Sequence, residues 1–254
     1  MDLSIVIPAY RENHKIADDV RAAAEFLVRE GLQGEILVVD DGSPDETAAI
    51  AESVEAPKQV ERKVIRYKPN RGKGYAIRTG MRQSRGQYVM FADSGNCVPY
   101  HYVLRGLEFL QNGACELAHG SRKLPQSIIK RKHHWYRMLF SRIFRRLVWS
   151  YMGIPHSITD SQCGFKMYRG DVARELYAEC KTDRFMFDAE IILRALAKGY
   201  RIREFPVEWN SDHDSRFRFF RASFQSLYDL MNVKRMLKRE KKQALNAAKA
   251  EAKT

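Results

Sequence analysis

The sequence predicts an α/β fold in which a mostly parallel sheet carries helices on both of its faces. Two observations support this prediction. Between residues 3 and 93, short apolar runs alternate with segments of helical periodicity, the pattern of repeated strand–helix units. In addition, polar or glycine-rich residues follow each apolar run. Because ligands of such sheets bind beyond the carboxyl ends of the strands, these residues indicate one shared site.

The individual elements follow from apolar runs and from their turn signals. A short apolar run bounded by Gly, Pro, Asn or Asp is read as a buried strand, and apolar residues at helical spacing are read as a helix. Pro8 is expected to end the first strand, Gly31 to stop the first helix and Asp45 to cap the second. The expected strands are residues 4–7, 35–39, 64–67, 88–92 and 117–120. The expected helices are residues 14–29, 45–54 and 74–84.

Composition narrows the class of protein. A chain of 254 residues that is 44% hydrophobic can bury a sizeable core and is expected to form one domain, or one domain with an appendage. The four cysteines show no CxxC spacing, so neither a zinc site nor a redox motif is indicated. The first residues lack a signal-peptide pattern, and no stretch reaches the ~18 apolar residues of a spanning helix. We expect a cytoplasmic protein that is soluble or peripheral to the membrane.

The net charge of +13 is concentrated in the second half of the chain. No Asp or Glu lies between Glu116 and Asp160, and residues 136–151 place apolar and basic side chains on opposite helical faces. This pattern predicts a helix in an anionic membrane interface, and the alternative is a packed helix with a solvated basic face. We expect a domain at 1–216 with a basic amphipathic insertion at 123–158. Residues 217–254 are expected to form a basic amphipathic segment that ends in a frayed helix or a disordered tail.

The residues after the first strands suit a nucleotide sugar. Pro8 and Tyr10 can flank a base, Glu12 can reach the ribose, and Asp41 can accept hydrogen bonds from base or ribose. Residues 70–74 open a helix with two cations, which favours a phosphate-bearing ligand. The alternative for Asp41 is an ordinary turn at the end of a strand.

The order of these motifs resembles the family 2 inverting glycosyltransferases of GT-A fold. The resemblance rests on residues 6–12, 38–43 and 70–74 and on Asp93 at the end of an apolar strand. Further motifs look like the dolichyl-phosphate β-glucosyltransferase and polyprenyl-phosphate glycosyltransferase branch, and the resemblance covers roughly residues 3–216. These motifs are residues 120–122, 160–166 and 184–190.

The resemblance implies a role for each matching residue. The nucleotide of the donor would be held by Pro8, Tyr10, Glu12, Asp41, Gly72, Lys73 and Asp93. The reaction centre would be formed by Asp93, Arg122, Asp160, Gln162 and Asp188. The acceptor phosphate would contact Arg122, Arg137 and Arg216. A divalent metal, Mg²⁺ or Mn²⁺, would be held by Asp93, with Asn96 as a further ligand.

Three of these roles can also be weighed on the residues themselves. Arg122 follows an apolar strand and precedes the basic helix, and its guanidinium matches a phosphate bidentately; the alternative is a surface arginine. Asp160 could act as a general base or could pair with a nearby arginine. Asp188 and Glu190 are two residues apart and face different sides of a helix, so we expect Asp188 at the site and Glu190 on a structural partner.

The sequence departs from the family at the metal motif. The family's DxD pattern requires an acid at position 95, where this chain has Gly95. Mg²⁺ can bind through one or two carboxylates together with substrate phosphates, so Asp93 could suffice. Alternatively, Lys73, Arg122 or Arg216 would neutralise the leaving diphosphate, or activity would be altered or lost.

We therefore expect transfer of a hexose, such as glucose from UDP-glucose, to a polyprenyl or dolichyl phosphate at the cytoplasmic membrane face, with inversion. One alternative keeps the fold with a soluble or glycan acceptor. Another is a non-catalytic protein that binds nucleotide sugar or membrane. A nucleic-acid partner is not expected, because the basic residues interleave with an apolar helical face and no nucleic-acid motif occurs.

Overall fold

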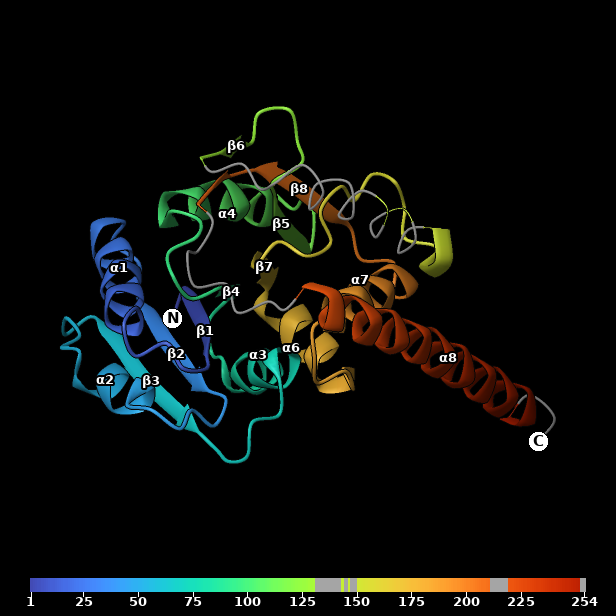
Figure 1. Cartoon of the computed structure of the whole chain (residues 1–254). Coiled ribbons are helices and arrows are strands. Elements are labelled where there is room, and N and C mark those ends of the chain that lie inside the picture. The colour runs from blue at the N-terminus through green and yellow to red at the C-terminus, as the bar shows by residue number, and fades with distance from the viewer. Residues whose placement is uncertain (131–142, 144–145, 147–149, 211–218, 252–254) are drawn as a thin grey trace.

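A seven-stranded sheet runs through the computed structural model (Figure 1). The structure describes residues 1–130, 143, 146, 150–210 and 219–251. In spatial order the strands are β3 (Val60–Arg66), β2 (Gly34–Asp40), β1 (Leu3–Ala9), β4 (Tyr88–Ala92), β7 (Phe165–Arg169), β5 (Leu117–Ser121) and β8 (Ile202–Pro206). Only β7 runs antiparallel to its neighbours in this sheet, so the prediction of a mostly parallel sheet is confirmed.

Helices cover both faces of the sheet, because successive side chains of each strand point to opposite faces. Ile5 and Ile7 of β1 belong to one hydrophobic core, and Val6 between them belongs to the other. On the first face pack α1 (Ile16–Arg29), α2 (Thr47–Ser53) and α4 (Val103–Gln111). On the second face pack α3 (Lys73–Gln83), α6 (Gly170–Glu179) and α7 (Phe187–Ala197).

The expected elements occur, with shifts at their ends. The strand expected at 88–92 has these bounds, whereas β1 includes Pro8 and does not end before it. Pro8 still pairs in register with Val39 of β2, but the pairing of β1 with β4 stops at Val6. A proline is tolerated at such a strand end because one neighbour no longer needs its missing N–H. The N-cap of α2 is Glu46 and not the expected Asp45, although Asp45 accepts a hydrogen bond from the backbone N–H of Thr47 at 3.3 Å.

The C-terminal segment is a long helix, α8 (Phe219–Glu251), which projects away from the sheet (Figure 1). Of the two expectations for the end of this segment, a helix is confirmed up to Glu251, and a disordered tail is wrong for these residues. Leu230 and Val233 are buried in a third core with Ile192 of α7, and Glu240 pairs with Arg194 at 2.9 Å. These contacts fix the middle of α8, and the Lys, Ala and Glu residues that follow have high helix propensity.

A second, two-stranded sheet pairs β6 (Ile128–Ile129) with β9 (Glu208–Trp209), and a short 3₁₀ helix, η1 (Tyr100–Tyr102), leads into α4. Most of the amphipathic segment expected at 136–151 lies outside the described residues, so its membrane-facing helix stays a prediction, as do the domain bounds. Within the described part of the chain, no helix combines the length and the apolar character needed to cross a bilayer.

Candidate functional site

The predicted site residues gather at one edge of the main sheet. Asp41 follows β2, Asp93 follows β4 and Arg122 follows β5, and the carboxyl ends of these parallel strands meet at the same edge. The antiparallel strand β7 contributes its amino end there, so residues 160–164, which precede Phe165, reach the same edge. The chain reversal at β7 thus brings the second half of the sequence to the site.

Asp41 organises the loop that precedes α3. Its buried carboxylate accepts hydrogen bonds from the Tyr67 hydroxyl at 2.9 Å, from Asn70 Nδ2 at 2.7 Å, and from the backbone N–H groups of Arg71 and Gly72, both at 2.8 Å. Burial and the neighbouring Asp41 carboxylate raise the pKa of Tyr67, so its hydroxyl stays protonated and donates. Contact of Asp41 with a nucleoside stays a prediction, because these four donors already occupy its oxygens.

The segment after β1 is tied to the loop after β2. The backbone N–H of Arg11 donates to Ser43 Oγ, and that of Glu12 donates to Thr47 Oγ1, both at 2.9 Å. Tyr10 is 38% exposed at this position, so its ring is available for stacking against a base. The nucleoside-binding roles of Pro8, Tyr10 and Glu12 are compatible with this arrangement and stay predictions.

The glycines before and within α3 allow the backbone of residues 182–184 to pack closely against this helix. A Cβ atom at Gly72 would lie 2.6 Å from the carbonyl oxygen of Asp183, and one at Gly74 would lie 2.6 Å from that of Thr182. The N–H of Tyr75 also donates to the Asp183 carbonyl at 3.0 Å, and Arg78 forms an ion pair with the Asp183 carboxylate. The sequence indicated a phosphate loop here and gave no sign that residues 182–184 pack against it.

Six charged side chains form three ion pairs at the site edge. Lys73 Nζ lies 2.6 Å from Asp93 Oδ1, Arg122 Nε lies 2.7 Å from Asp160 Oδ2, and Lys166 Nζ lies 2.6 Å from Asp188 Oδ1. The pairs also act on one another, since Asp188 contributes to the raised pKa of Lys73. We call Lys73, Asp93, Arg122, Asp160, Lys166 and Asp188 the ion-pair cluster.

Arg122 and Asp160 form a bidentate pair. Beside the contact of Nε with Oδ2, Arg122 Nη2 lies 2.9 Å from Oδ1, and the Arg122 backbone N–H donates to Oδ2 at 3.0 Å. Glu204 of β8 accepts the N–H of Asp160 at 2.8 Å. Burial would raise the pKa of Asp160, but Arg122 outweighs it and holds that pKa below its usual range. Asp160 is thereby suited to orient Arg122 and is a weak base.

Asp188 and Glu190 lie in different surroundings. Lys166, only 1% exposed, bonds to Asp188 and also donates to the carbonyl of Cys163 at 2.8 Å. Glu190 accepts the N–H groups of Lys181 and Thr182 at 3.0 and 2.8 Å, so it holds the loop that packs on α3. Sequence reasoning gave Lys166 no role of its own; a lysine inside an apolar strand was the available signal.

The other predicted site residues form no hydrogen bond or ion pair with the ion-pair cluster that the described structure shows. Gln162 is exposed beside the buried Cys163. Burial raises the pKa of the Cys163 thiol to about 12, which leaves it protonated. Arg137 and Arg216 fall outside the described residues, so their contact with an acceptor phosphate stays a prediction.

The side chains at the site do not match a two-acid metal motif. Gly95 and Asn96 have positive φ angles of 93° and 47°, and their N–H groups donate to the Asp19 carboxylate at 2.8 and 2.9 Å. Asp93 is paired with Lys73. Within the described ranges, no three His, Cys, Asp or Glu residues come together in a way that could hold a metal ion. These residues therefore do not fit the metal set of the family, and a ligand role for Asn96 stays a prediction.

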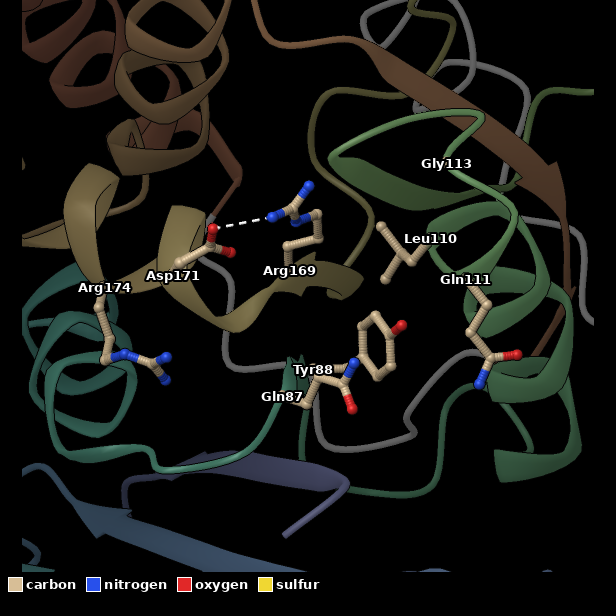
Figure 2. A pocket seen from close by; sticks show the side chains of 8 residues that line it. All are labelled: Gln87, Tyr88, Leu110, Gln111, Gly113, Arg169, Asp171 and Arg174. Carbon is tan, nitrogen blue, oxygen red and sulfur yellow. Dashed lines mark hydrogen bonds and ion pairs between the residues drawn. The ribbon is translucent and has the colours of Figure 1, made fainter.

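A separate hollow lies at the opposite edge of the sheet (Figure 2). It encloses about 440 Å³ and is lined in part by Tyr88, the first residue of β4, and Arg169, the last residue of the antiparallel β7. Arg169 pairs there with Asp171 at 3.0 Å. Because this edge carries the amino ends of the parallel strands, the hollow is not the place where such sheets bind their ligands.

Comparison with protein families agrees with this geometry. The model described as glycosyl transferase family 2 matches residues 4–177. The dolichyl-phosphate beta-glucosyltransferase of Saccharomyces cerevisiae is 30% identical over 250 residues, which cover 91% of this chain and 74% of the yeast protein. The Homo sapiens protein of the same name is 29% identical over 243 residues, with the same two coverages of 91% and 74%.

Solved structures show the same architecture. Glucosyl-3-phosphoglycerate synthase from Mycobacterium tuberculosis in complex with UDP superimposes with a TM-score of 0.69 at 17% identity, over 92% of this chain and 80% of the synthase chain. The synthase with Mn²⁺, UDP-glucose and phosphoglyceric acid gives 0.69 at 16% identity, over 92% and 79%. This likeness confirms the expected GT-A fold.

Proposed function

The chain belongs to glycosyl transferase family 2, and from that membership we propose that it moves a hexose from a nucleotide sugar to a polyprenyl or dolichyl phosphate. The anomeric carbon is inverted in this reaction. Relatives of about 30% identity over most of the chain are named dolichyl-phosphate beta-glucosyltransferases, which supports glucose as the sugar and a dolichyl-type phosphate as the acceptor. The similar synthase was solved with UDP-glucose, which supports UDP-glucose as the donor.

The observation that carries the proposal is the position of the Arg122–Asp160 pair. Arg122 follows the carboxyl end of β5, and two hydrogen bonds to Asp160 fix one side of its guanidinium, while a third holds its backbone N–H. Its charged centre also lies 5.3 Å from the ring of Trp209 in β9. A planar cation held in this way presents its remaining N–H groups in a fixed direction, which suits a phosphate acceptor.

The proposed reaction joins the acceptor phosphate to the sugar of the nucleotide donor. An oxygen of the acceptor phosphate forms a bond to the anomeric carbon, and the bond from that carbon to the nucleoside diphosphate breaks with its electron pair on the diphosphate. The acceptor is already an anion, so the weakly basic Asp160 is not needed to remove a proton. Catalysis would come from positioning and from charge neutralisation at the leaving group.

A lipid acceptor requires contact with a membrane, and exposed apolar residues lie close to Arg122 in the chain. Ile128 and Ile129 of β6 are 53% and 39% exposed and are followed by Lys130. Apolar side chains beside basic ones are typical of surfaces that rest in a membrane interface. We propose that this rim, together with the rest of the basic amphipathic insertion expected at 123–158, rests on the cytoplasmic face of an anionic membrane.

The test is transfer of labelled sugar to a short polyprenyl phosphate in detergent. UDP-glucose, UDP-galactose and GDP-mannose are compared, each with Mg²⁺, Mn²⁺ or EDTA, because the synthase was solved with Mn²⁺ and Asp93 is an acid that a divalent ion could share with the donor phosphates. We expect label in the lipid phase from UDP-glucose. A protein that binds nucleotide but labels no polyprenyl phosphate from any donor would refute the proposal.

A soluble phosphate acceptor is the second candidate function. The observation in its favour is the similar synthase, which was solved with phosphoglyceric acid beside UDP-glucose. Detergent or liposomes separate the two candidates, since a soluble acceptor would be glycosylated equally well without them.

A further inference from the structure

Lys73 forms an ion pair with Asp93, the residue that the family resemblance assigns to the metal. It is the first residue of α3, its ammonium lies 2.6 Å from Asp93 Oδ1, and its side chain is 23% exposed. Burial would lower the pKa of Lys73, but Asp93 outweighs it and keeps the ammonium charged. A permanent cation therefore stands beside Asp93 at the site edge.

Asp93 lies against Gly164 on one side of its carboxylate. Its backbone N–H donates to the carbonyl of Gly164 at 2.8 Å, and a Cβ atom at Gly164 would lie 1.9 Å from Asp93 Oδ2. The carboxylate thus lies directly against the backbone of the segment that leads into β7. The backbone of Asp93 is held by the hydrogen bond to Gly164, and its side chain, 33% exposed, is bounded by Gly164 on one side and paired with Lys73.

The positions that follow Asp93, residues 94–96, contain no second acid that could bind a metal ion. Residue 95 is a glycine, and the nearby carboxylate, Asp19 of α1, accepts the backbone N–H groups of Gly95 and Asn96. Asp19 is 2% exposed and shapes the loop from the side of α1. The other acids of the ion-pair cluster, Asp160 and Asp188, are each bonded to a cation of their own.

We propose that Lys73 supplies the positive charge at the leaving diphosphate, in the position where relatives with two acids use a divalent ion. This inference rests on the proposed function. As the bond between the anomeric carbon and the diphosphate breaks, the ammonium of Lys73 keeps its proton and neutralises part of the charge that collects on the diphosphate. Its place at the amino end of α3 adds the favourable field of the helix terminus.

The test measures binding and is independent of sugar transfer. UDP and GDP, each against its own nucleoside, are titrated in EDTA into the wild type, Lys73→Met and Lys63→Met. Lys63 is an exposed lysine of β3 that donates to Gln83 and serves as the matched control. We expect Lys73→Met to weaken binding of the diphosphate about 100-fold and to leave the nucleoside unchanged, since one charged contact to a phosphate is removed.

A second experiment measures the affinity for Mn²⁺ in the presence of the diphosphate, from the electron paramagnetic resonance signal of the ion. Because Lys73→Met frees Asp93, we expect it to bind Mn²⁺ about 10-fold more tightly than the wild type. The inference is overturned if the wild type needs Mn²⁺ to bind the diphosphate, or if Lys73→Met changes neither affinity. Absence of transfer with both binding shifts present would refute the proposed function and leave the Lys73 assignment standing; Lys73→Arg, which keeps the charge, should restore diphosphate binding.

Discussion

The side of the site that we propose for the donor, formed by the ends of β1, β2 and β4, differs from the side that we propose for the acceptor, formed by the ends of β5, β7 and β8. We call them the donor side and the acceptor side. On the donor side, Asp41 and Asp19 accept backbone N–H groups and shape loops. On the acceptor side, Asp160 and Asp188 bind the side-chain cations Arg122 and Lys166. Backbone donors fix a shape, whereas side-chain cations can exchange a carboxylate for a ligand anion.

This difference suggests how the two substrates are received. The donor side would accept the nucleoside with little rearrangement, because its loops are already held by hydrogen bonds. The acceptor side would respond to the charge of the incoming phosphate, because its cations are paired with carboxylates. Lys73 and Asp93 form the junction between the two sides, with one residue at the start of α3 and the other after β4.

The largest effect is expected from breaking the deeply buried ion pair between Lys166 and Asp188. Lys166→Met leaves the carboxylate of Asp188 buried without its cation, and we expect unfolding free energy to fall by about 3–5 kcal/mol. Urea denaturation measures the loss. The double variant Lys166→Met/Asp188→Leu should recover most of it, because no uncompensated charge remains. A loss below about 1 kcal/mol in the single variant would contradict the importance of this pair.

The donor side should respond to a single carboxylate in a different way. Asp41→Asn turns an amide group toward donors that need an acceptor, and we expect a loss of about 2 kcal/mol together with weaker binding of UDP. Asp18→Asn, at an exposed position of α1, is the control. Unchanged stability and unchanged UDP affinity in Asp41→Asn would show that the loop is held by other contacts.

The geometry of the acceptor side can be tested without removing its charge. Arg122→Lys keeps a cation but cannot form the bidentate pair with Asp160. We expect the KM for polyprenyl phosphate to rise about 10-fold while the affinity for UDP is unchanged, because the substitution acts on the acceptor contact. Steady-state kinetics and titration with UDP measure the two quantities. Equal weakening of both would mean that Arg122 serves the donor.

A smaller, pH-dependent effect is expected at His119 of β5. This residue is buried next to Tyr168, and neither ring nitrogen has a hydrogen-bond partner among the described residues. Burial, and then Lys166, hold the pKa of His119 well below its ordinary value of 6.5. In the unfolded chain His119 binds a proton at a pH where the folded chain keeps it neutral. The free energy of unfolding therefore decreases as pH falls below about 6.5.

The variant His119→Phe removes the imidazole and therefore the proton uptake that accompanies unfolding. We expect the wild type to lose about 1 kcal/mol more than the variant between pH 6.5 and pH 5.5, measured by urea denaturation at each pH. Parallel curves for the two proteins would show that His119 is not kept neutral by the fold.

Sequence reasoning predicted the place of the residues on the proposed donor side more completely than the contacts on the proposed acceptor side. Asp41 and Asp93 follow apolar strands, and parallel strands bring their carboxyl ends to one edge, so a local pattern implies a spatial one. The roles of Lys166, Glu204 and Asp183 depend on the antiparallel β7, on its neighbour β5 and on packing between distant segments. No local pattern carries that information. The sequence left a frayed helix and a disordered tail as alternatives for the end of α8, because its anchor, Glu240, pairs with Arg194 in another helix.

The most direct test of the central claim is a competition for sugar from UDP-glucose between a short polyprenyl phosphate and 3-phosphoglycerate, at equal concentration in detergent. The product is separated by partition between organic and aqueous phases, with Arg122→Lys run in parallel. We predict that labelled glucose passes to the lipid phase and that Arg122→Lys lowers this transfer. Label that appears in phosphoglycerate alone, or in neither acceptor while UDP is bound, would contradict the account.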